Sequence, residues 1–432
     1  MVMGCLFKEQ SVAAEYPYNI HPAGAFIIFW FLIFWLAMME GGQGCIVGLQ
    51  LVDKALYQET HKITYKNTKL VHNGDNLERF LVGRQVLVVL VVFLINMCGS
   101  AVKDADPLGL PSGVNAVFLD NGLAMMMTTI IIGQLTSQVS AAVCMLDFIN
   151  NYFMTFTSYV SLGIEFSGLL HCVYLVQMFF SKITGKPVES NEPPRNGAQN
   201  LFFWARVLMS TAILAFALAV TIQALFDGNS GIWNGIPSVV SIIIFFLLLG
   251  VVGLMEGMQI AAFALINVPE KDLKQYSVAY SNCTLMFSGQ NLQSFLIGRQ
   301  IFVGSLLFIV ARIATLDIPD GEDNIFGVSD GLQNFFNTGL LGAVILAIIG
   351  SLAWRIIASS FPLEFMSNPL IYVIIRICLI LEATGIASAA WLLALIYKGV
   401  TKYQIDEVYL GKSDVGTKDD IESQKEELAT IQ

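Results

Sequence analysis

The chain has 432 residues and a formal net charge of −10, and its mean hydropathy is +0.67. Hydrophobic residues make up 55% of it and charged residues only 13%, about half the charged share of an average soluble protein. These values predict an all-α, polytopic membrane protein, and the acidic balance argues against a nucleic-acid partner. Charged residues such as Lys8 and Glu15 interrupt residues 1–24, so we expect no signal peptide there.

Apolar runs of about 20 residues are long enough to cross a bilayer, and they predict nine transmembrane helices. The predicted spans are residues 24–52, 80–100, 115–142, 150–180, 202–226, 236–266, 295–316, 332–352 and 369–397. The predicted domains are an N-terminal segment (1–23), a first transmembrane repeat (24–181), an extramembrane linker (182–201), a second repeat with its leading helix (202–397) and an acidic cytoplasmic tail (398–432).

One polar pattern occurs twice within these spans. Each copy has a Glu-Gly-x-Gln motif followed by Gly-Arg-Gln, and the Glu-to-Arg separations are 44 and 43 residues. A charged side chain at a helix centre costs about 2.5–3.5 kcal/mol by insertion scales. Two such sets in register therefore predict a duplicated polar site in a transport protein. The candidate substrate-binding residues are Glu40, Gln43, Arg84 and Gln85 in the first copy and Glu256, Gln259, Arg299 and Gln300 in the second.

The repeat extends beyond these motifs. Residues 76–85 match residues 291–300, and Glu165 followed by Gly168 matches Glu382 followed by Gly385. Four consecutive spans therefore repeat, with the extra span 202–226 before the second copy. Corresponding spans lie five apart, and an odd offset predicts inverted repeats, as in many secondary transporters.

The two spans that carry the Glu motif are long and rich in glycine. Either a tilted helix or a broken one accommodates that length, and a broken helix would free backbone carbonyls for a cation. The candidates for ion coupling or for a supporting layer around the substrate are Gly41, Gly42, Glu165, Gly257 and Glu382. The alternative is that the Glu–Arg pairs only clamp neighbouring helices together.

The sequence contains none of the motifs HExxH, GxSxG or P-loop, and no histidine spacing typical of a metal site. We therefore predict neither an enzyme nor a cofactor. An intramembrane enzyme is also disfavoured because the polar residues are repeated, whereas catalysis usually needs different acids and bases.

The paired Glu-Gly-x-Gln and Gly-Arg-Gln motifs, together with Cys144-Met-Leu-Asp147, resemble the silicon transporters of diatoms and related silicifying algae. This resemblance implies sodium-coupled uptake of silicic acid by alternating access, with the eight motif residues as the substrate site. The family pattern has ten spans, so we expect that a span before residue 24 is missing. The alternative is a channel-like facilitator of small neutral hydroxylated solutes, with the arginines excluding cations.

The partners implied are silicic acid, sodium as the coupling ion, membrane lipids and a second copy in a homo-oligomer. The plasma membrane is the expected location, with an intracellular or silica-deposition vesicle membrane as the alternative. Silicic acid is neutral at physiological pH and presents four hydroxyls, each a donor and an acceptor. A cage of carboxylate, amide and guanidinium groups suits such a ligand.

The nine-span topology places 10 Lys and Arg residues on one side and 8 on the other. Loop 53–79 and the tail hold five each, which is the whole of the first group, so we place them in the cytosol. The glycosylation sequon Asn282-Cys-Thr284 then falls outside.

Overall fold

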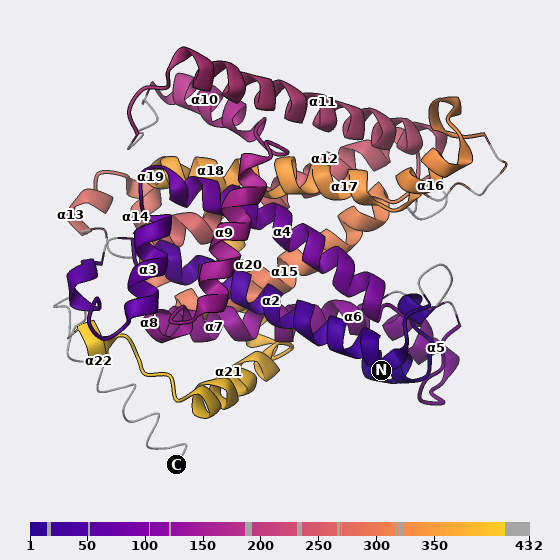
Figure 1. Cartoon of the computed structure of the whole chain (residues 1–432), viewed down its shortest axis with the longest axis horizontal. Helices are drawn as coiled ribbons and strands as arrows, with labels where there is room; N and C mark the ends of the chain where they lie inside the picture. Colours follow the sequence, from indigo (N-terminus) through magenta and orange to yellow (C-terminus); the bar gives the residue numbers. More distant parts are fainter. Residues whose placement is uncertain are drawn as a thin grey trace.

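The computed structural model describes residues 1–410 except 15–18, 51, 103, 121, 186–191, 231–235, 266–267, 269, 317, 319–320 and 322. These described residues form helices and turns, with no β-strand among them (Figure 1). Residues 411–432, most of the predicted tail, lie outside the described part. The all-α prediction is confirmed.

The same order of elements occurs twice along the chain, on either side of α11 (Gly197–Asp227). The first half contains α2 (Pro22–Gly48), α3 (Lys62–Val71), α4 (Asn76–Gly99), α6 (Leu123–Thr128), π-helical η4 (Thr129–Leu135), α7 (Thr136–Val143), α8 (Met145–Phe148), α9 (Tyr152–Phe166) and α10 (Val173–Thr184). The second contains α12 (Ser238–Leu265), α14 (Ser277–Phe287), α15 (Asn291–Ala314), α17 (Leu340–Ile345), π-helical η6 (Leu346–Leu352), α18 (Ala353–Ser360), α19 (Pro362–Met366), α20 (Leu370–Ala383) and α21 (Ser388–Thr401).

Short elements occupy the ends of the molecule. They are α1 (Val2–Phe7), η1 (Val12–Ala14), η2 (Lys54–Leu56), α5 (Ser112–Asn115), η3 (Ala116–Asp120), α13 (Glu270–Leu273), η5 (Ile325–Gly327), α16 (Asp330–Asn337) and α22 (Glu407–Leu410).

Seven continuous helices among the described residues are long and apolar enough to cross a membrane, or eight if the bent pair α20 and α21 counts as one span. The polytopic membrane architecture is therefore confirmed, but the count of nine is too high. The seven continuous helices are Pro22–Gly48, Asn76–Gly99, Leu123–Val143, Gly197–Asp227, Ser238–Leu265, Asn291–Ala311 and Leu340–Ser360.

The predicted spans 150–180 and 369–397 are each divided in two. The first breaks between α9 and α10 at Gly168 (φ 82°), and the second breaks between α20 and α21 at Gly385 (φ 77°). Positive φ is the left-handed region, which glycine adopts without steric cost and which ends a right-handed helix. Hydropathy alone does not register this backbone reversal, so each segment looked like a single span.

The first divided segment enters and leaves at the same end of the molecule. Thr155, near the start of α9, donates to Asn67 of α3 at 2.6 Å. Gln177 of α10 donates to Ser360 at the end of α18 at 2.9 Å and to Glu78 in the first turn of α4 at 3.4 Å. We call this end of the molecule the α3 end. The pair α9–α10 is therefore a re-entrant hairpin and not a crossing.

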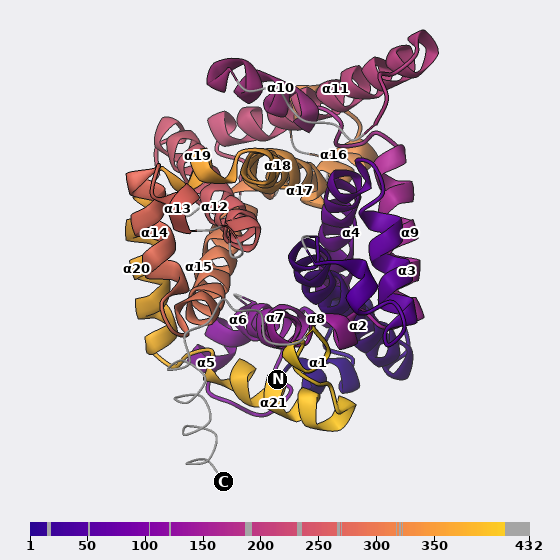
Figure 2. The same ribbon diagram turned by 90° about the vertical axis from the view of Figure 1, so that its left-hand side faces the viewer.

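The second divided segment, α20–α21, also begins and ends at the α3 end. Asn282 of α14 donates to the carbonyl of Met366, just before α20, at 2.8 Å. After α21, the backbone N–H of Asp406 donates to the carbonyl of Val143 at 3.2 Å, beside α8. Both ends of α20–α21 thus lie at the α3 end, where α3, α8, α14 and α19 gather (Figures 1 and 2).

The two halves run in the same direction. A cavity of about 760 Å³ is lined by Val47 at the end of α2, Ala264 at the end of α12, Ser360 at the end of α18 and Leu77 at the start of α4. Because α2 and α12 end at the same cavity, the predicted inverted repeat is wrong. The physical reason is the re-entrant α9–α10, which leaves corresponding spans four apart instead of five.

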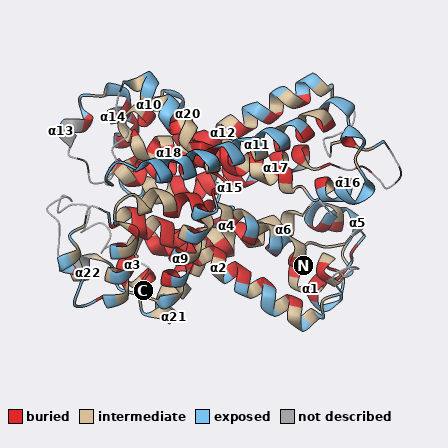
Figure 3. Cartoon of the chain, turned by 45° about the horizontal axis from the view of Figure 1, so that its top comes forward, coloured by how far each residue is buried: buried red, intermediate tan, exposed pale blue. Residues whose placement is uncertain are grey.

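Buried residues of the long helices α2, α4 and α12 are most numerous in the half of each helix that lies nearer the α3 end (Figure 3). There, α4 packs against α9 and α15 packs against α20. A side chain at Gly83 would collide with the backbone oxygen of Ser161, and one at Gly298 with that of Cys378. The glycine of each Gly-Arg-Gln motif is therefore a close-packing position that lets two backbones approach.

Candidate transport site

The first-half motif residues form a buried network between α2 and α4. Arg84 donates to Glu40 Oε1 and to Gln43 Oε1, each at 3.1 Å. Gln138 of α7 donates to the other oxygen of Glu40, Oε2, at 3.0 Å. The predicted Glu–Gln–Arg set is thus brought together, and α7 contributes a further amide.

The second half builds a similar network from α12, α15 and α18. Arg299 lies 3.4 Å from Glu256 Oε1, and Arg355 Nε donates to Glu256 Oε2 at 2.8 Å. Arg355 also contacts that oxygen through a terminal guanidinium nitrogen. Glu256 is therefore held by two arginines, whereas Glu40 is held by an arginine and a glutamine.

Two contacts join these two buried networks across the boundary between the halves. Arg355 of α18 donates to Gln43 Oε1 of α2 at 3.0 Å, and Gln300 of α15 donates to Gln134 Oε1 of η4 at 2.6 Å. Arg299 holds Gln300 by a donor contact of 2.8 Å to its Oε1. The polar groups therefore form one cluster at the boundary between the halves, which we call the central cluster.

Sequence reasoning missed Gln134, Gln138 and Arg355. It placed Arg355 in a loop, residues 353–368, but α18 continues directly from η6 and carries Arg355 as a buried residue, 4% exposed. The signal was available in the repeat. The 217-residue offset between Glu165 and Glu382 also aligns Gln138 with Arg355. Both follow a π-helical segment, a feature found frequently at functional sites.

Seven buried polar atoms of the motif residues and their neighbours have no hydrogen-bond partner among the described residues. A buried polar group without a partner costs about 1–3 kcal/mol, so such a group favours a ligand that completes its hydrogen bonds. Three are nitrogen donors, three are amide oxygen acceptors and one is a hydroxyl. They are Gln43 Nε2, Arg84 Nη1, Arg299 Nε, Gln85 Oε1, Gln138 Oε1, Gln259 Oε1 and Ser351 Oγ.

The cavity of about 760 Å³ lies one helical turn from these residues. Its wall includes Val47, four residues after Gln43 on α2, and Ser359, four residues after Arg355 on α18. Residues four apart lie on the same helix face. The cavity therefore lies at the α3 end beside helices that also carry the central cluster, although none of its lining residues belongs to that cluster.

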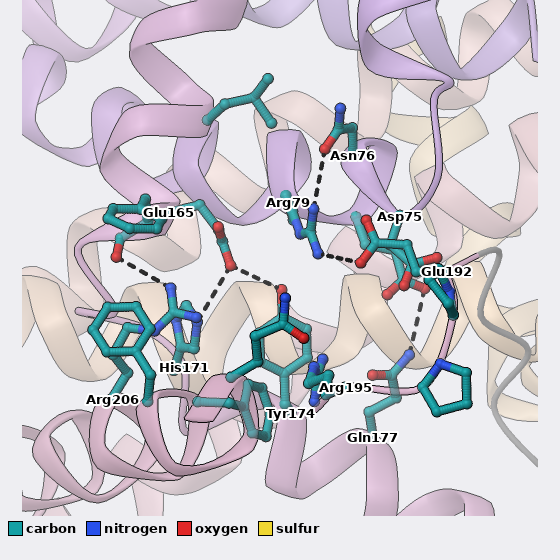
Figure 4. A pocket seen from close by; sticks show the side chains of 18 residues that line it. Asp75, Asn76, Arg79, Glu165, His171, Tyr174, Gln177, Glu192, Arg195 and Arg206 are labelled. Carbon is teal, nitrogen blue, oxygen red and sulfur yellow. Dashed lines mark hydrogen bonds and ion pairs between the residues drawn. The ribbon is translucent and has the colours of Figure 1, made fainter. Parts of the chain in front are cut away.

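Glu165 lies in a different cavity, of about 520 Å³, at the tip of the α9–α10 hairpin (Figure 4). Its carboxylate lies 3.3 Å from His171 Nε2 and accepts from the Tyr174 hydroxyl at 3.4 Å. Arg206 of α11 donates to the neighbouring carbonyl of Phe166 at 3.1 Å. None of the residues that line this cavity belongs to the central cluster.

Glu382, at the equivalent hairpin tip in the second half, is partly exposed on α20. The structure therefore does not bring Glu165 or Glu382 to the central cluster. Their role in ion coupling stays a prediction, now attached to the hairpin tips.

The glycine candidates lie within continuous helices. Both α2 (27 residues) and α12 (28 residues) run unbroken through their Glu motifs, so the broken-helix alternative is not the one observed. A side chain at Gly41 would meet the ring of Phe148, and one at Gly257 the ring of Phe365. Gly42 packs in the same way against Met154. Close packing accounts for these glycines in this structure.

The Cys144-Met-Leu-Asp147 motif holds the segment after α21. Asp147 accepts from the backbone N–H of Gln404 at 2.6 Å and lies 3.1 Å from His61 Nε2. Asp406 accepts from the N–H groups of Met145 and Leu146 at 2.8 and 2.9 Å. Burial raises the pKa of Asp406 to about 6, although these two N–H groups oppose the shift.

A multi-helix membrane protein with a duplicated, buried Glu–Gln–Arg cluster has the features of a solute transporter. The family model described as silicon transporter matches residues 1–430. The chain therefore belongs to the silicon transporter family. No curated protein and no solved structure match it.

Proposed function

We propose that this protein transports silicic acid as a sodium-coupled secondary transporter, and that the central cluster binds the substrate. The family supports silicic acid as the solute. The observation that carries the binding site is the set of unpartnered buried donors and acceptors on both halves. A tetrahedral acid with four hydroxyls can both donate to the amide oxygens and accept from the guanidinium and amide nitrogens.

Alternating access is supported by the way the halves meet. Parallel repeats are related by an axis along the membrane normal, and such halves can rock against each other around a site at their boundary. The contacts Arg355–Gln43 and Gln300–Gln134 cross that boundary. Rocking would break and remake them while the cavity at the α3 end closes and one at the opposite end opens.

The distribution of basic residues supports a cytosolic α3 end. At the opposite end, the basic residues in the part of the chain that the structure describes are Lys8 and Arg312, in the last turn of α15. The segments at the α3 end carry Lys54, Lys62, Lys66, Lys69, Arg79, Lys182, Arg195, Lys271, Lys274, Lys398 and Lys402. The cavity then faces the cytosol.

The predicted exterior position of Asn282 is inconsistent with this arrangement. Loop 267–294 lies at the same end as loop 53–79, since α2 and α12 both end there. The side chain of Asn282 is 1% exposed and donates to Met366. It is therefore a packing residue of the α3 end.

We place the coupling sodium outside the central cluster. All four carboxylate oxygens of Glu40 and Glu256 already accept from Arg or Gln side chains. A hard cation needs carboxylate and carbonyl oxygens that are not held by cationic donors. Glu165, in its own cavity beside the backbone reversal at Gly168, is the carboxylate we propose for this role.

The test is uptake into proteoliposomes. With an inward sodium gradient, we expect silicic acid to accumulate above its external concentration. With potassium replacing sodium at the same membrane potential, it should only equilibrate. Equal, non-concentrative flux in both salts would favour the channel-like facilitator instead.

A further inference from the structure

The central cluster contains an odd number of charges. Glu40, Glu256, Arg84, Arg299 and Arg355 are each at most 6% exposed. Two carboxylates and three guanidinium groups leave one positive charge in excess. Because arginine remains protonated in proteins, the excess is a permanent property of the empty cluster.

Three arginines share two carboxylates in this cluster. Arg355 shares Glu256 with Arg299 and also donates to Gln43 Oε1, a neutral amide oxygen. The excess charge arises from one difference between the repeats: the second half has Arg355 where the first half has the neutral Gln138. A buried charge without a partner is unfavourable, and an anionic ligand relieves it.

We propose that the central cluster binds its tetrahedral hydroxylated acid as the monoanion, with Arg355 as the residue that selects the ionised form. This rests on the proposed function and specifies the chemical species that the site holds. One O–H bond of the neutral acid breaks heterolytically, its electron pair stays on that oxygen, and the proton passes to water. Silicon is neither oxidised nor reduced.

The unpartnered atoms suit this species. The monoanion keeps three hydroxyl groups that donate, and the set contains three unpartnered amide oxygens, on Gln85, Gln138 and Gln259. Arg84 Nη1 and Arg299 Nε are unpartnered cationic donors available to an oxyanion. A neighbouring positive charge also favours the ionised form of an acid.

The experiment is titration calorimetry of the purified full chain with orthosilicic acid, in chloride-free buffers of different ionisation enthalpy. We expect about one proton released per acid bound. Arg355→Gln, which copies the first-half residue Gln138, should weaken binding at least about tenfold and abolish proton release. Arg376→Gln is the matched control, because Arg376 is an exposed arginine of α20. This variant should leave the affinity and the number of protons released unchanged.

A second measurement needs no variant. If the monoanion binds, the apparent affinity of the wild-type chain should rise about tenfold per unit between about pH 6 and 8, where the free acid is almost entirely neutral. A flat affinity, or binding without proton release, would overturn the proposal. Displacement of bound chloride with no proton release would assign the excess charge to a chloride ion and would equally overturn it.

The outcomes also separate this inference from the proposed function. Unaltered binding in both Glu40→Gln and Arg355→Gln would remove the central cluster as the substrate site, and with it both proposals. Saturable binding that is lost in Glu40→Gln but releases no proton in the wild type would leave the proposed function standing and refute only the anionic species.

Discussion

The two halves share a scaffold but differ in the chemistry of the side chains that face their glutamates. Glu40 meets Arg84 and the amide of Gln138, whereas Glu256 meets Arg299 and Arg355. The helices, π-helical segments and hairpins occur in the same order in both halves. One side-chain difference, glutamine against arginine, therefore changes the charge of the whole cluster while leaving the backbone repeat intact.

The halves also differ in what surrounds the short helices α8 and α19, which follow α7 and α18 at equivalent turns of the chain. In the first half, the corner at α8 is covered by the segment around Asp406, which is hydrogen-bonded to Met145 and Leu146. In the second half, Pro362 and Glu364 of α19 line the cavity of about 760 Å³ at the α3 end. Equivalent turns thus have different surroundings, one a docked segment of the chain and the other a cavity.

The largest expected effect concerns the direction of the halves. In a cysteine-free background, Lys62→Cys and Lys274→Cys should both resist an impermeant thiol reagent on intact cells and both react after permeabilisation. Lys8→Cys, at the opposite end, should react without permeabilisation. If Lys62→Cys and Lys274→Cys differ from each other, the halves are inverted after all and the common α3 end is refuted.

The next effect compares the two glutamates. Glu256→Gln leaves two buried arginines without a carboxylate, and Glu40→Gln leaves one. Breaking a buried ion pair costs about 3–5 kcal/mol, so both variants should lose uptake, with Glu256→Gln lowering the thermal midpoint more. Uptake and thermal unfolding in detergent measure this. Equal midpoints for the two variants would show that the doubled arginine contact of Glu256 carries no additional energy.

A smaller effect tests the close packing that the halves have in common. Gly83→Ala and Gly298→Ala should each destabilise the protein by about 1–3 kcal/mol, because the added methyl meets a backbone oxygen of the neighbouring helix. Gly163→Ala on α9 is the matched control, since its methyl would have nothing within 4 Å. Thermal unfolding of the three variants provides the comparison, and destabilisation by all three alike would remove the packing explanation.

The smallest effect lies at the α8 corner and depends on pH. The folded-state pKa of Asp406, about 6, is above the ordinary value of 3.8. Docking is therefore strongest below about pH 4 and weakens as pH rises through about 6, because ionisation in a buried position is unfavourable. Protease sensitivity after α21 should rise over this range.

Asp406→Asn should remove that pH dependence, whereas a variant that retained it would show that Asp406 is not its cause.

The sequence by itself determined the membrane class, the duplication and the eight motif residues, because charged side chains in apolar runs and equal spacings are visible without coordinates. The resemblance of those motifs to the silicon transporters was likewise carried by the residues alone, and the family match agrees with it. Long hydrophobic helices such as α2 and α12 were also found close to their observed bounds, since their apolar content is continuous.

Tertiary structure decided the rest. Hydropathy counts apolar residues but not changes of direction, so the reversals at Gly168 and Gly385 hid two re-entrant hairpins and turned the expected inverted repeat into a parallel one. The position of Arg355 in the cluster depends on α18 continuing from η6 and on helix packing that brings α18 beside α2 and α12. Side chains more than 300 residues apart meet only after the halves pack, and that contact sets the charge of the site.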